Sequence, residues 1–386
     1  MNFAESMAIS SGLKKSKPHI EESFFPVVPK KYITISSENH QSKQWDHFQE
    51  FINLIKPMLD KEGISIIEIG SNEVQLQNVI SLKGATNANH WAYIIKNSIL
   101  HIGPENFLSH LSSFYDTPCV MLFSNTSPDY ALPSWSKNKD NQYILQSDLK
   151  SNKPSFSSEE PIKSINTISA EKCASITLDH LSIDNSFSDI EVFYIGPLHH
   201  HKLVEIVPDF IPQPNFFPKS LINLRLDYHF NEESLLHFAS NRKISIVSDK
   251  QIDTRILSRI KPAISHLFLK INESFDLNYV KFLKHNGFNI SLIATEDANL
   301  SDTRLKFFDF DVSEETKKTK KDLDISELIC DDTRYQSSKQ IFSKDGIFSS
   351  KSSFDRKIKN HKDQIVIDEK SFWEDAEYFK FYNLKS

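Results

Sequence analysis

Apolar, strand-like segments alternate with segments of helical periodicity through the first third of the chain, and this alternation restricts the fold more than any other feature. The strand-like segments are residues 31–36, 64–69, 77–82, 98–102 and 118–123. The helical segments are residues 45–57, 89–96 and 107–114. The last strand is apolar throughout, as strands buried on both faces of a parallel sheet are. The pattern predicts a doubly wound α/β domain over residues 30–185, with ligands at the carboxyl ends of its strands.

A second region of alternation begins near Val192 and predicts a second α/β domain over residues 190–311. Its expected strands are 192–196, 222–227, 244–247, 266–271 and 290–294, and its expected helices are 232–240, 253–260 and 277–285. Residues 1–29 show no sustained period and indicate a loosely packed lead-in. The Ser-, Asn-, Lys- and Pro-rich residues 137–161 are typical of a loop. Residues 312–386 are interpreted as a charged connector and an aromatic C-terminal extension that docks onto a domain.

Glycine is scarce, with 8 residues in 386. No two glycines lie within six residues of each other. The P-loop and the GxGxxG fingerprint both need closely spaced glycines, because only a residue without Cβ lets backbone amides approach phosphate. The sequence therefore excludes both loops. A phosphate would have to be bound by isolated glycines at strand ends and by the positive end of a helix.

Composition indicates which partners the protein can bind and in which compartment it works. Lys and Arg number 45 against 51 Asp and Glu, a net charge of −6, so there is no basic field to attract nucleic acid. The three cysteines are more than fifty residues apart, which fits neither a zinc site nor a disulfide framework. No signal peptide or long apolar run is present. We expect a cytoplasmic protein without a transmembrane segment or nucleic-acid partner, for which peripheral contact with a membrane stays open.

Residues 100–111, LHIGPENFLSHL, are the most informative stretch for chemistry. They predict a strand, a Gly-Pro turn at Gly103 and a helix whose first turn Glu105 or Asn106 can cap. Residues 117–128, TPCVMLFSNTSP, follow as a buried strand and a polar loop. The unpaired amides of the helix then point at the edge of the sheet. This arrangement is typical of a site for an anion or a polyol.

These stretches resemble the nucleotide-sugar motif of the ADP-heptose:lipopolysaccharide heptosyltransferases, glycosyltransferase family 9. That motif runs Gly-Pro, an acid, small residues and then His-Leu. The flanks agree in order: Lys43-Gln44-Trp45 resembles the family's Lys-x-Trp, residues 64–73 its strand ending in Gly-x-x-Glu, and residues 172–181 its Cys-containing segment. The resemblance covers residues 30–185, less than half of the chain. It corresponds to the C-terminal, nucleotide-binding half of a GT-B enzyme.

The resemblance implies a GT-B-like, Rossmann-type domain and metal-independent transfer of a sugar from a nucleotide-sugar donor to a glycan or lipid-linked acceptor, as in lipopolysaccharide biosynthesis. No cofactor beyond the donor is implied. Lys43 would pair with the diphosphate, and Glu73 would accept a hydrogen bond from a ribose hydroxyl. The remaining residues implied to bind the donor are Gly103, Glu105, Asn106 and His110.

One departure from the family pattern supports a second hypothesis. Phe107 stands where the family has glycine, and its side chain would crowd a closely approaching phosphate. The alternative is therefore a catalytically inactive GT-B-like binding or scaffolding protein. The family's acceptor-binding domain does not precede this region, and the catalytic base is unassigned. Asp209, Asp227 and Asp249 are candidates for that base by position alone, near expected strand ends of the second domain.

Several residues also have a purely structural interpretation. Glu105 can favour a helix dipole while His110 packs beneath the sheet, and Lys43 and Glu73 can be ordinary surface residues. Trp45 is expected in the core of the first helix. Other structural expectations are a polar turn at His199–His201, a strand with outward acids at Asp309–Asp311 and an inert buried thiol at Cys119. No metal site is predicted.

Overall fold

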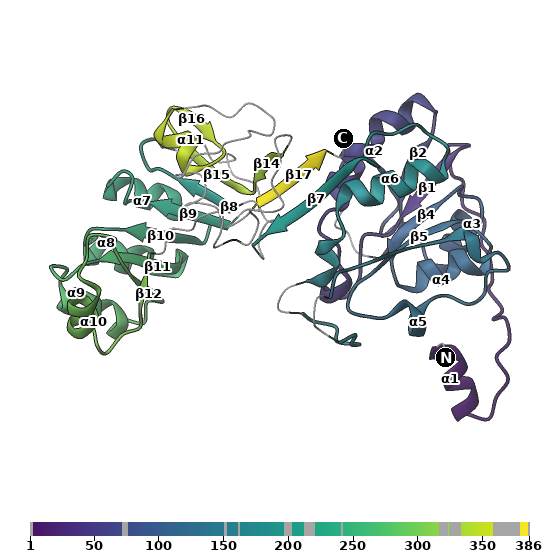
Figure 1. Ribbon diagram of the computed structural model, residues 1–386, viewed down its shortest axis with the longest axis horizontal. Helices are drawn as coiled ribbons and strands as arrows, with labels where there is room; N and C mark the ends of the chain where they lie inside the picture. Colours follow the sequence, from purple (N-terminus) through teal and green to yellow (C-terminus); the bar gives the residue numbers. More distant parts are fainter. Residues whose placement is uncertain are drawn as a thin grey trace. The chain divides into compact units, whose positions relative to one another are not determined.

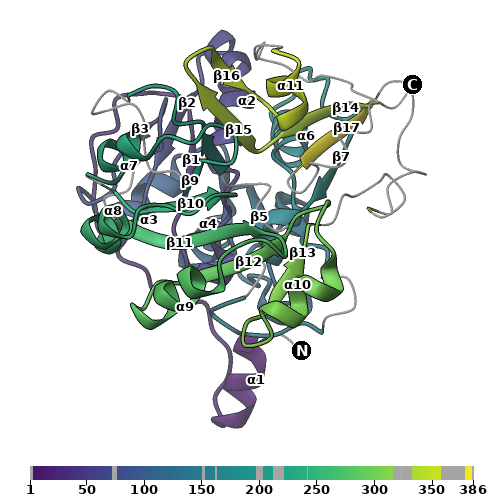
Figure 2. The same ribbon diagram turned by 90° about the vertical axis from the view of Figure 1, so that its left-hand side faces the viewer.

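A computed structural model describes the chain in ten stretches: residues 3–71, 76–149, 153–160, 163–196, 203–211, 221–240, 242–315, 323, 333–357 and 379–384. The chain divides between Val192 and Phe193 into two compact units (Figures 1 and 2). In the described residues, none of the helices combines the length and the apolar character that crossing a membrane requires.

The first unit is built on a parallel sheet of six strands in the order β3-β2-β1-β4-β5-β6. These strands are β1 (Tyr32–Ile35), β2 (Ser65–Glu68), β3 (Ile80–Ser81), β4 (His101–Pro104), β5 (Cys119–Phe123) and β6 (Gln142–Gln146). The chain builds outward from β1 to β3 and then returns to the other side of β1. Strand order therefore reverses between β1 and β4, which defines a topological switch point.

Helices cover both faces of this sheet (Figure 1). The helical elements of the first unit are α1 (Phe3–Ser10), η1 (Gln41–Lys43), α2 (Phe48–Lys61), α3 (Ala88–Lys96), α4 (Phe107–Phe114), α5 (Pro128–Ala131), η2 (Lys139–Asn141), η3 (Ser164–Thr167) and α6 (Ala170–His180). α2 and α6 bury their apolar residues against one face, and α3 and α4 bury theirs against the other. Two-sided cover is what the predicted doubly wound domain requires.

Strand β5 shows how the sequence meets this demand. Val120 and Leu122 enter the core under α2 and α6, whereas Cys119, Met121 and Phe123 pack on the opposite face beside the end of α5. All five residues are fully or almost fully buried, because a strand between two helical layers has no solvent-facing side. Burial raises the pKa of the Cys119 thiol to about 12, which agrees with the expected inert side chain.

The second unit contains a larger, almost wholly parallel sheet in the order β13-β12-β11-β10-β9-β8-β15-β16, with only the β15–β16 pair antiparallel. Its strands are β8 (Leu203–Ile206), β9 (Leu221–Arg225), β10 (Ile244–Ser248), β11 (Ile264–Ile271), β12 (Ile290–Ala294), β13 (Val312–Glu314), β15 (Lys339–Ser343) and β16 (Gly346–Phe348). A small sheet combines β7 (Ile190–Ile195), β14 (Arg334–Ser337) and β17 (Phe379–Leu384).

Helices of the second unit are α7 (Glu232–Ala239), α8 (Thr254–Ile260), η4 (Lys261–Ala263), α9 (Leu277–His285), α10 (Leu300–Lys306) and α11 (Lys351–Asp355). From β8 to β13 each strand lies beside the next one in the chain. Right-handed crossovers in one direction place the connecting helices on one face. Consistently, α7 to α10 share a single hydrophobic core with alternate residues of these strands. The sheet is therefore singly wound from β8 to β13, after which the chain returns to place β15 on the other side of β8.

The predicted fold class is confirmed: a doubly wound α/β unit is followed by a second α/β unit with parallel strands. Some local predictions were wrong. The expected loop at 137–161 contains β6, because its three apolar residues Tyr143, Ile144 and Leu145 form too short a run to indicate a strand. The loosely packed lead-in expected at residues 1–29 contains the short helix α1, whose described side chains are mostly exposed. Trp45 is buried but precedes α2, with its Nε1 donating to Ile168 O at 2.9 Å.

The expected strand at Asp309–Asp311 was also wrong. These residues form the turn between α10 and β13, which begins at Val312. Asp309 instead lies 3.9 Å from the ammonium of Lys281 on α9. Before it, Leu305 and Lys306 end α10, and Phe307 and Phe308 belong to the turn, so apolar residues alone did not indicate the type of element.

Candidate functional site

The candidate site of the first unit lies at its switch point. Residues 36–39 follow β1, and Glu105 and Asn106 follow β4, so both loops leave the carboxyl edge of the sheet where its strand order reverses. Asn39 Nδ2 joins the two loops by donating to Glu105 O at 3.2 Å. Ligands of open α/β sheets bind at this edge, in the crevice that the reversal creates.

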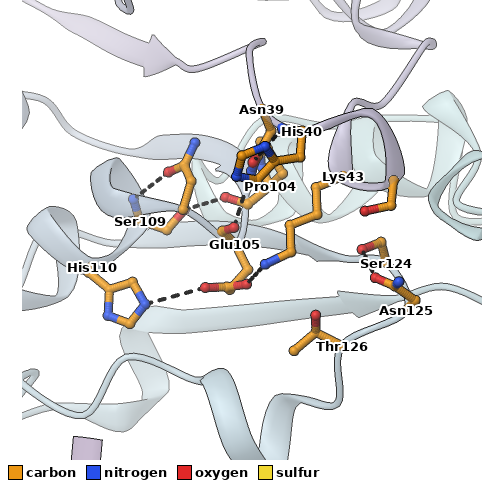
Figure 3. Close-up of polar contacts among 12 residues, drawn as sticks. Asn39, His40, Lys43, Pro104, Glu105, Ser109, His110, Ser124, Asn125 and Thr126 are labelled. Carbon is orange, nitrogen blue, oxygen red and sulfur yellow. Dashed lines mark hydrogen bonds and ion pairs between the residues drawn. The ribbon is translucent and has the colours of Figure 1, made fainter. Parts of the chain in front are cut away.

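Three predicted residues meet at this edge (Figure 3). The Lys43 ammonium, at the end of η1, forms an ion pair with Glu105 Oε2. His110 Nε2, on α4, lies 3.5 Å from the other carboxylate oxygen of Glu105. Lys43 and His110 thus approach the Glu105 carboxylate from opposite sides. Lys43 and Glu105 are 62 residues apart in the sequence. They meet because β1 and β4, which precede them, pair in parallel.

The ionisation of Glu105 reflects two opposing effects. Burial of this carboxyl group favours its neutral form, while the hydrogen bonds from His110 and Lys43 favour the carboxylate. The hydrogen bonds outweigh the effect of burial, so the pKa of Glu105 lies below its ordinary value. At neutral pH the site therefore combines one cation with one anion. Such a pair suits a ligand that carries both a phosphate group and hydroxyl groups.

The first turn of α4 begins at Asn106. Its Oδ1 accepts from the backbone amides of Leu108 and Ser109 at 2.9 and 3.1 Å, and its Nδ2 donates to Ser36 Oγ at 3.3 Å. Asn106 is therefore the cap, one of the two residues expected for that role. Phe107 is 55% exposed, so its ring points toward solvent rather than into the core.

Gly103 is the one predicted glycine at the base of the site. A Cβ at this position would overlap the Ser36 hydroxyl and would lie 3.3 Å from His101 Nε2. The β1 and β4 backbones can therefore approach closely only with glycine here. His101 is fully buried beneath it, with Nδ1 at 3.0 Å from Thr34 Oγ1 and Nε2 at 3.4 Å from Ser36 Oγ.

The sixth predicted residue, Glu73, lies outside the described residues. The nearby carboxylate that the structure does describe is Glu38, which sits against Gly70 and accepts hydrogen bonds from the backbone and hydroxyl groups of Ser71. A second carboxylate, Glu68, forms a buried ion pair with Lys83 at 3.0 Å. Glu38 follows β1 and Glu68 ends β2, so both lie at the carboxyl edge of the sheet. Sequence analysis named neither as a site residue.

Sequence analysis described the residues after β5 as a polar loop but named none of them as site residues. Asn125 Nδ2 donates to Ser155 Oγ and Ser157 O at 3.0 Å each, and Ser42 Oγ donates to Ser157 O at 2.9 Å. The stretch 153–160 thereby connects the loop after β1 to the loop after β5. Figure 3 shows Ser124, Asn125 and Thr126 on the side of Lys43 that faces away from His110. Their position directly after a buried strand was the signal that could have identified them.

The three candidate bases of the second unit differ in surroundings. Asp227 accepts two hydrogen bonds from Arg225, at 2.8 and 2.7 Å. Burial of Asp227 acts to raise its pKa, but Arg225 and Lys270 outweigh burial and hold it below the ordinary value, which opposes proton abstraction. Asp209 accepts from the backbone amide of Lys344 at 2.8 Å, and Asp249 is exposed.

No group of three or more His, Cys, Asp or Glu side chains is arranged around a potential metal position in the described stretches of the chain. His199–His201 lie outside those stretches. The absence of a resident cofactor stays a prediction.

No family model and no curated protein matches the chain by sequence. Among solved structures, the ADP-heptose lipopolysaccharide heptosyltransferase II of E. coli matches 46% of this chain and 51% of its own, with 16% identity and a TM-score of 0.32. A glycosyl transferase family 9 protein from Veillonella parvula matches 46% and 50%, with 15% identity and a TM-score of 0.32. The E. coli heptosyltransferase WaaC with ADP matches 46% and 54%, with 17% identity and the same TM-score.

The matched part spans about half the length of each of these structures. The chemistry of the site has to be interpreted from its own residues.

Proposed function

We propose that this chain is a glycosyltransferase-like protein that binds a nucleotide-sugar donor at the switch point of its first unit. It transfers the sugar to a glycan or a lipid-linked, lipopolysaccharide-type acceptor. The observation that carries the proposal is the position of Lys43, whose ammonium lies at the β1–β4 reversal beside Glu105 at the start of α4. The motif around residues 100–111, interpreted above from the sequence, supports the same assignment.

The site residues have distinct roles in this proposal. Lys43 and the N-terminus of α4 offset the charge of the diphosphate, which grows as the bond to the sugar breaks. Glu105 accepts hydrogen bonds from sugar hydroxyls, and His110 and Asn106 hold Glu105 and the first turn of α4 in place. Transfer also needs a base that removes the proton of the acceptor hydroxyl. We assign no residue to that role.

One observation favours a second function, that of a binding protein without transferase activity. The charged groups of the site already satisfy each other: Lys43 pairs with Glu105, and the Leu108 and Ser109 amides pair with Asn106. A donor must displace the Lys43–Glu105 pair before its diphosphate reaches the ammonium. Together with the Phe107 side chain, this competition would weaken donor binding.

Thermal unfolding with ADP, UDP, GDP and CDP sugars distinguishes the two functions. A ligand that binds only the folded chain stabilises it by about 2.7 kcal/mol at 100 times its Kd. We expect one nucleotide to raise the unfolding temperature and Lys43→Met to abolish that rise. Lys96→Met is the matched control. Lys96 is the last residue of α3 and pairs with Glu22 rather than with a site residue, so this variant should keep the full rise in unfolding temperature. If no nucleotide acts at millimolar concentration, the transferase function is rejected.

The Glu105→Gln variant separates the two parts of the donor. Removal of the carboxylate frees the Lys43 ammonium, so a nucleoside diphosphate alone should bind more tightly than to the wild type. The complete nucleotide sugar should gain less, because Glu105 no longer accepts from its hydroxyls as an anion. Equal gains for both ligands, measured by titration calorimetry, would contradict the assigned role of Glu105.

A further inference from the structure

A polar cluster joins the carboxyl ends of β1, β2 and β3 in the first unit. Glu68 is the last residue of β2, while Ser37 follows β1 and Lys83 follows β3. Lys83 Nζ lies 3.0 Å from Glu68 Oε1, and these two side chains are 2% and 0% exposed. The Ser37 hydroxyl accepts a hydrogen bond from Lys83 Nζ at 2.7 Å and donates one to Glu68 Oε1 at 2.6 Å. We call Ser37, Glu68 and Lys83 the edge cluster.

Stability alone does not account for a buried ion pair at this place. Ile66, on the same face of β2 as Glu68, belongs to the apolar core under α2 and α6. Charged groups lose their hydration when they are buried, and replacing such a pair by apolar residues is often neutral or stabilising. An ion pair does, however, hold a neighbouring polar group in one position, because its hydrogen bonds are short and directional. In the edge cluster that group is the Ser37 hydroxyl.

Ser37 belongs to the loop of residues 36–39, which leads from β1 towards η1 and Lys43. On its other side this loop is tied to the residues after β4, because Asn39 Nδ2 donates to Glu105 O at 3.2 Å (Figure 3). The loop is thus held between the edge cluster and the candidate site. Its position determines where η1 begins, and hence where the Lys43 ammonium lies beside Glu105.

We propose that Glu68 and Lys83 are positioning residues of the candidate site. Through the Ser37 hydroxyl they fix residues 36–39, and they thereby keep the Lys43 ammonium where a diphosphate would meet it. Both side chains are buried, so they act through Ser37 and not by contact with a ligand. The proposal rests on the proposed function only for the identity of the ligand, since the positioning of Lys43 does not depend on one.

Substitution of Ser37 separates positioning from stability. Ser37→Ala keeps the direct Glu68–Lys83 ion pair but removes the hydroxyl that connects this pair to the loop. Its affinity for the nucleotide sugar found among the ADP, UDP, GDP and CDP sugars should be about tenfold lower, the factor that loss of a supporting residue has in metal sites. Ser37→Thr retains a hydroxyl and should restore the affinity. A hydroxyl with a structural role alone would lower the unfolding temperature and leave the affinity of the folded chain unchanged.

A double-mutant cycle tests whether the ion pair acts through Ser37. Glu68→Gln with Lys83→Met removes both charges and keeps an acceptor for the Leu76 amide, which donates to Glu68 Oε2 at 3.0 Å. Alone, this change should lower the affinity by about the same factor as Ser37→Ala. In the Ser37→Ala background it should have no further effect, because residues that act through one shared partner are not additive.

Hydrogen exchange measured by mass spectrometry needs no ligand. The Lys43 amide donates to His40 O at 2.9 Å, so its exchange reports on the order of η1. Ser37→Ala should make exchange at residues 40–44 about fivefold faster, since one hydrogen bond contributes about that factor to local stability. Ser98→Ala is the matched control, because Ser98 is a buried serine before β4, at the opposite edge of the sheet, and should leave this exchange unchanged.

The outcomes distinguish failure of this proposal from failure of the proposed function. If no nucleotide sugar binds the wild type, the proposed function fails and the exchange measurement alone decides the positioning. Exchange at residues 40–44 that is the same in the wild type and in Ser37→Ala overturns the proposal. Where a nucleotide sugar binds, equal affinities of these two proteins overturn it as well, and so does a further loss of affinity when the pair is substituted in the Ser37→Ala background.

Discussion

His101 is the most unusual residue of the first unit, because it is a histidine with no exposed surface at the base of the candidate site. Thr34 and Ser36 provide hydroxyl partners for its two ring nitrogens, but no described carboxylate pairs with it. Burial lowers the pKa of His101 to about 3, so its ring is neutral at neutral pH. A neutral ring can satisfy both hydroxyls while β1 and β4 approach closely at Gly103.

The lowered pKa predicts acid sensitivity. In the unfolded chain His101 takes up a proton near its ordinary pKa of 6.5, but in the folded chain only near 3. Stability is therefore full above about pH 6.5 and falls by about 1.4 kcal/mol per pH unit below it. His101→Gln removes this titration. In urea unfolding at several pH values, the stability advantage of the wild type over the variant should shrink as pH falls. An advantage that is constant with pH would contradict the buried neutral state.

At the scale of elements, the face of the second sheet opposite α7 to α10 carries a chain of buried ion pairs. Glu205 of β8, Arg225 of β9 and Lys270 of β11 alternate with core residues and so lie opposite the helices. Arg225 lies 2.6 Å from Glu205 and 2.7 Å from Asp227, and its guanidinium stacks 3.7 Å from the Tyr228 ring centroid. Helices α7 to α10 do not cover this face; the charged residues pair with one another there, and Phe354 of α11 stacks on Tyr228.

Removal of Arg225 should be costly, because it leaves Glu205 and Asp227 buried without their main partner. We expect Arg225→Met to lower the free energy of unfolding by about 3–5 kcal/mol. Arg255→Met is the matched control: Arg255 lies 2.6 Å from Asp253, but its side chain is 90% exposed, so no measurable change is expected. Urea unfolding of both variants measures the difference. Equal effects would show that burial of the network does not matter.

At the scale of the whole molecule, the two units have separate hydrophobic cores. The largest cluster contains only residues of the second unit, and the cluster under α2 and α6 contains only residues of the first. Each core is completed by the helices of its own sheet. Stability is therefore a property of each unit, and one free energy of unfolding does not describe the chain.

Hydrogen exchange measured by mass spectrometry tests this separation. Leu257→Ala opens a cavity in the fully buried core of the second unit and should cost about 2–5 kcal/mol there. Protection should fall in β9 to β12 and stay unchanged in β1, β4 and β5. Ile52→Ala is the reciprocal variant, in the core of the first unit, and should have the opposite pattern. Equal loss of protection in both units after either substitution would contradict separate cores.

The sequence by itself determined the existence and type of most strands and helices, because periodicity and buried apolar runs depend on neighbouring residues. It predicted α4 at residues 107–114 and α9 at 277–285 with the bounds that the structure has. Short elements such as β6 and β8 were missed, since four or five residues carry little periodic signal.

Tertiary structure alone decided strand order, and with it the site. Two regions with the same alternation became a doubly wound sheet and a sheet that runs in one direction from β8 to β13, because contacts between distant strands select the order. The motif placed Glu105 and His110 together, but only the adjacency of β1 and β4 brought Lys43 to them and let Glu105 neutralise its charge. Charge pairing depends on distance in space, which periodicity along the chain does not specify.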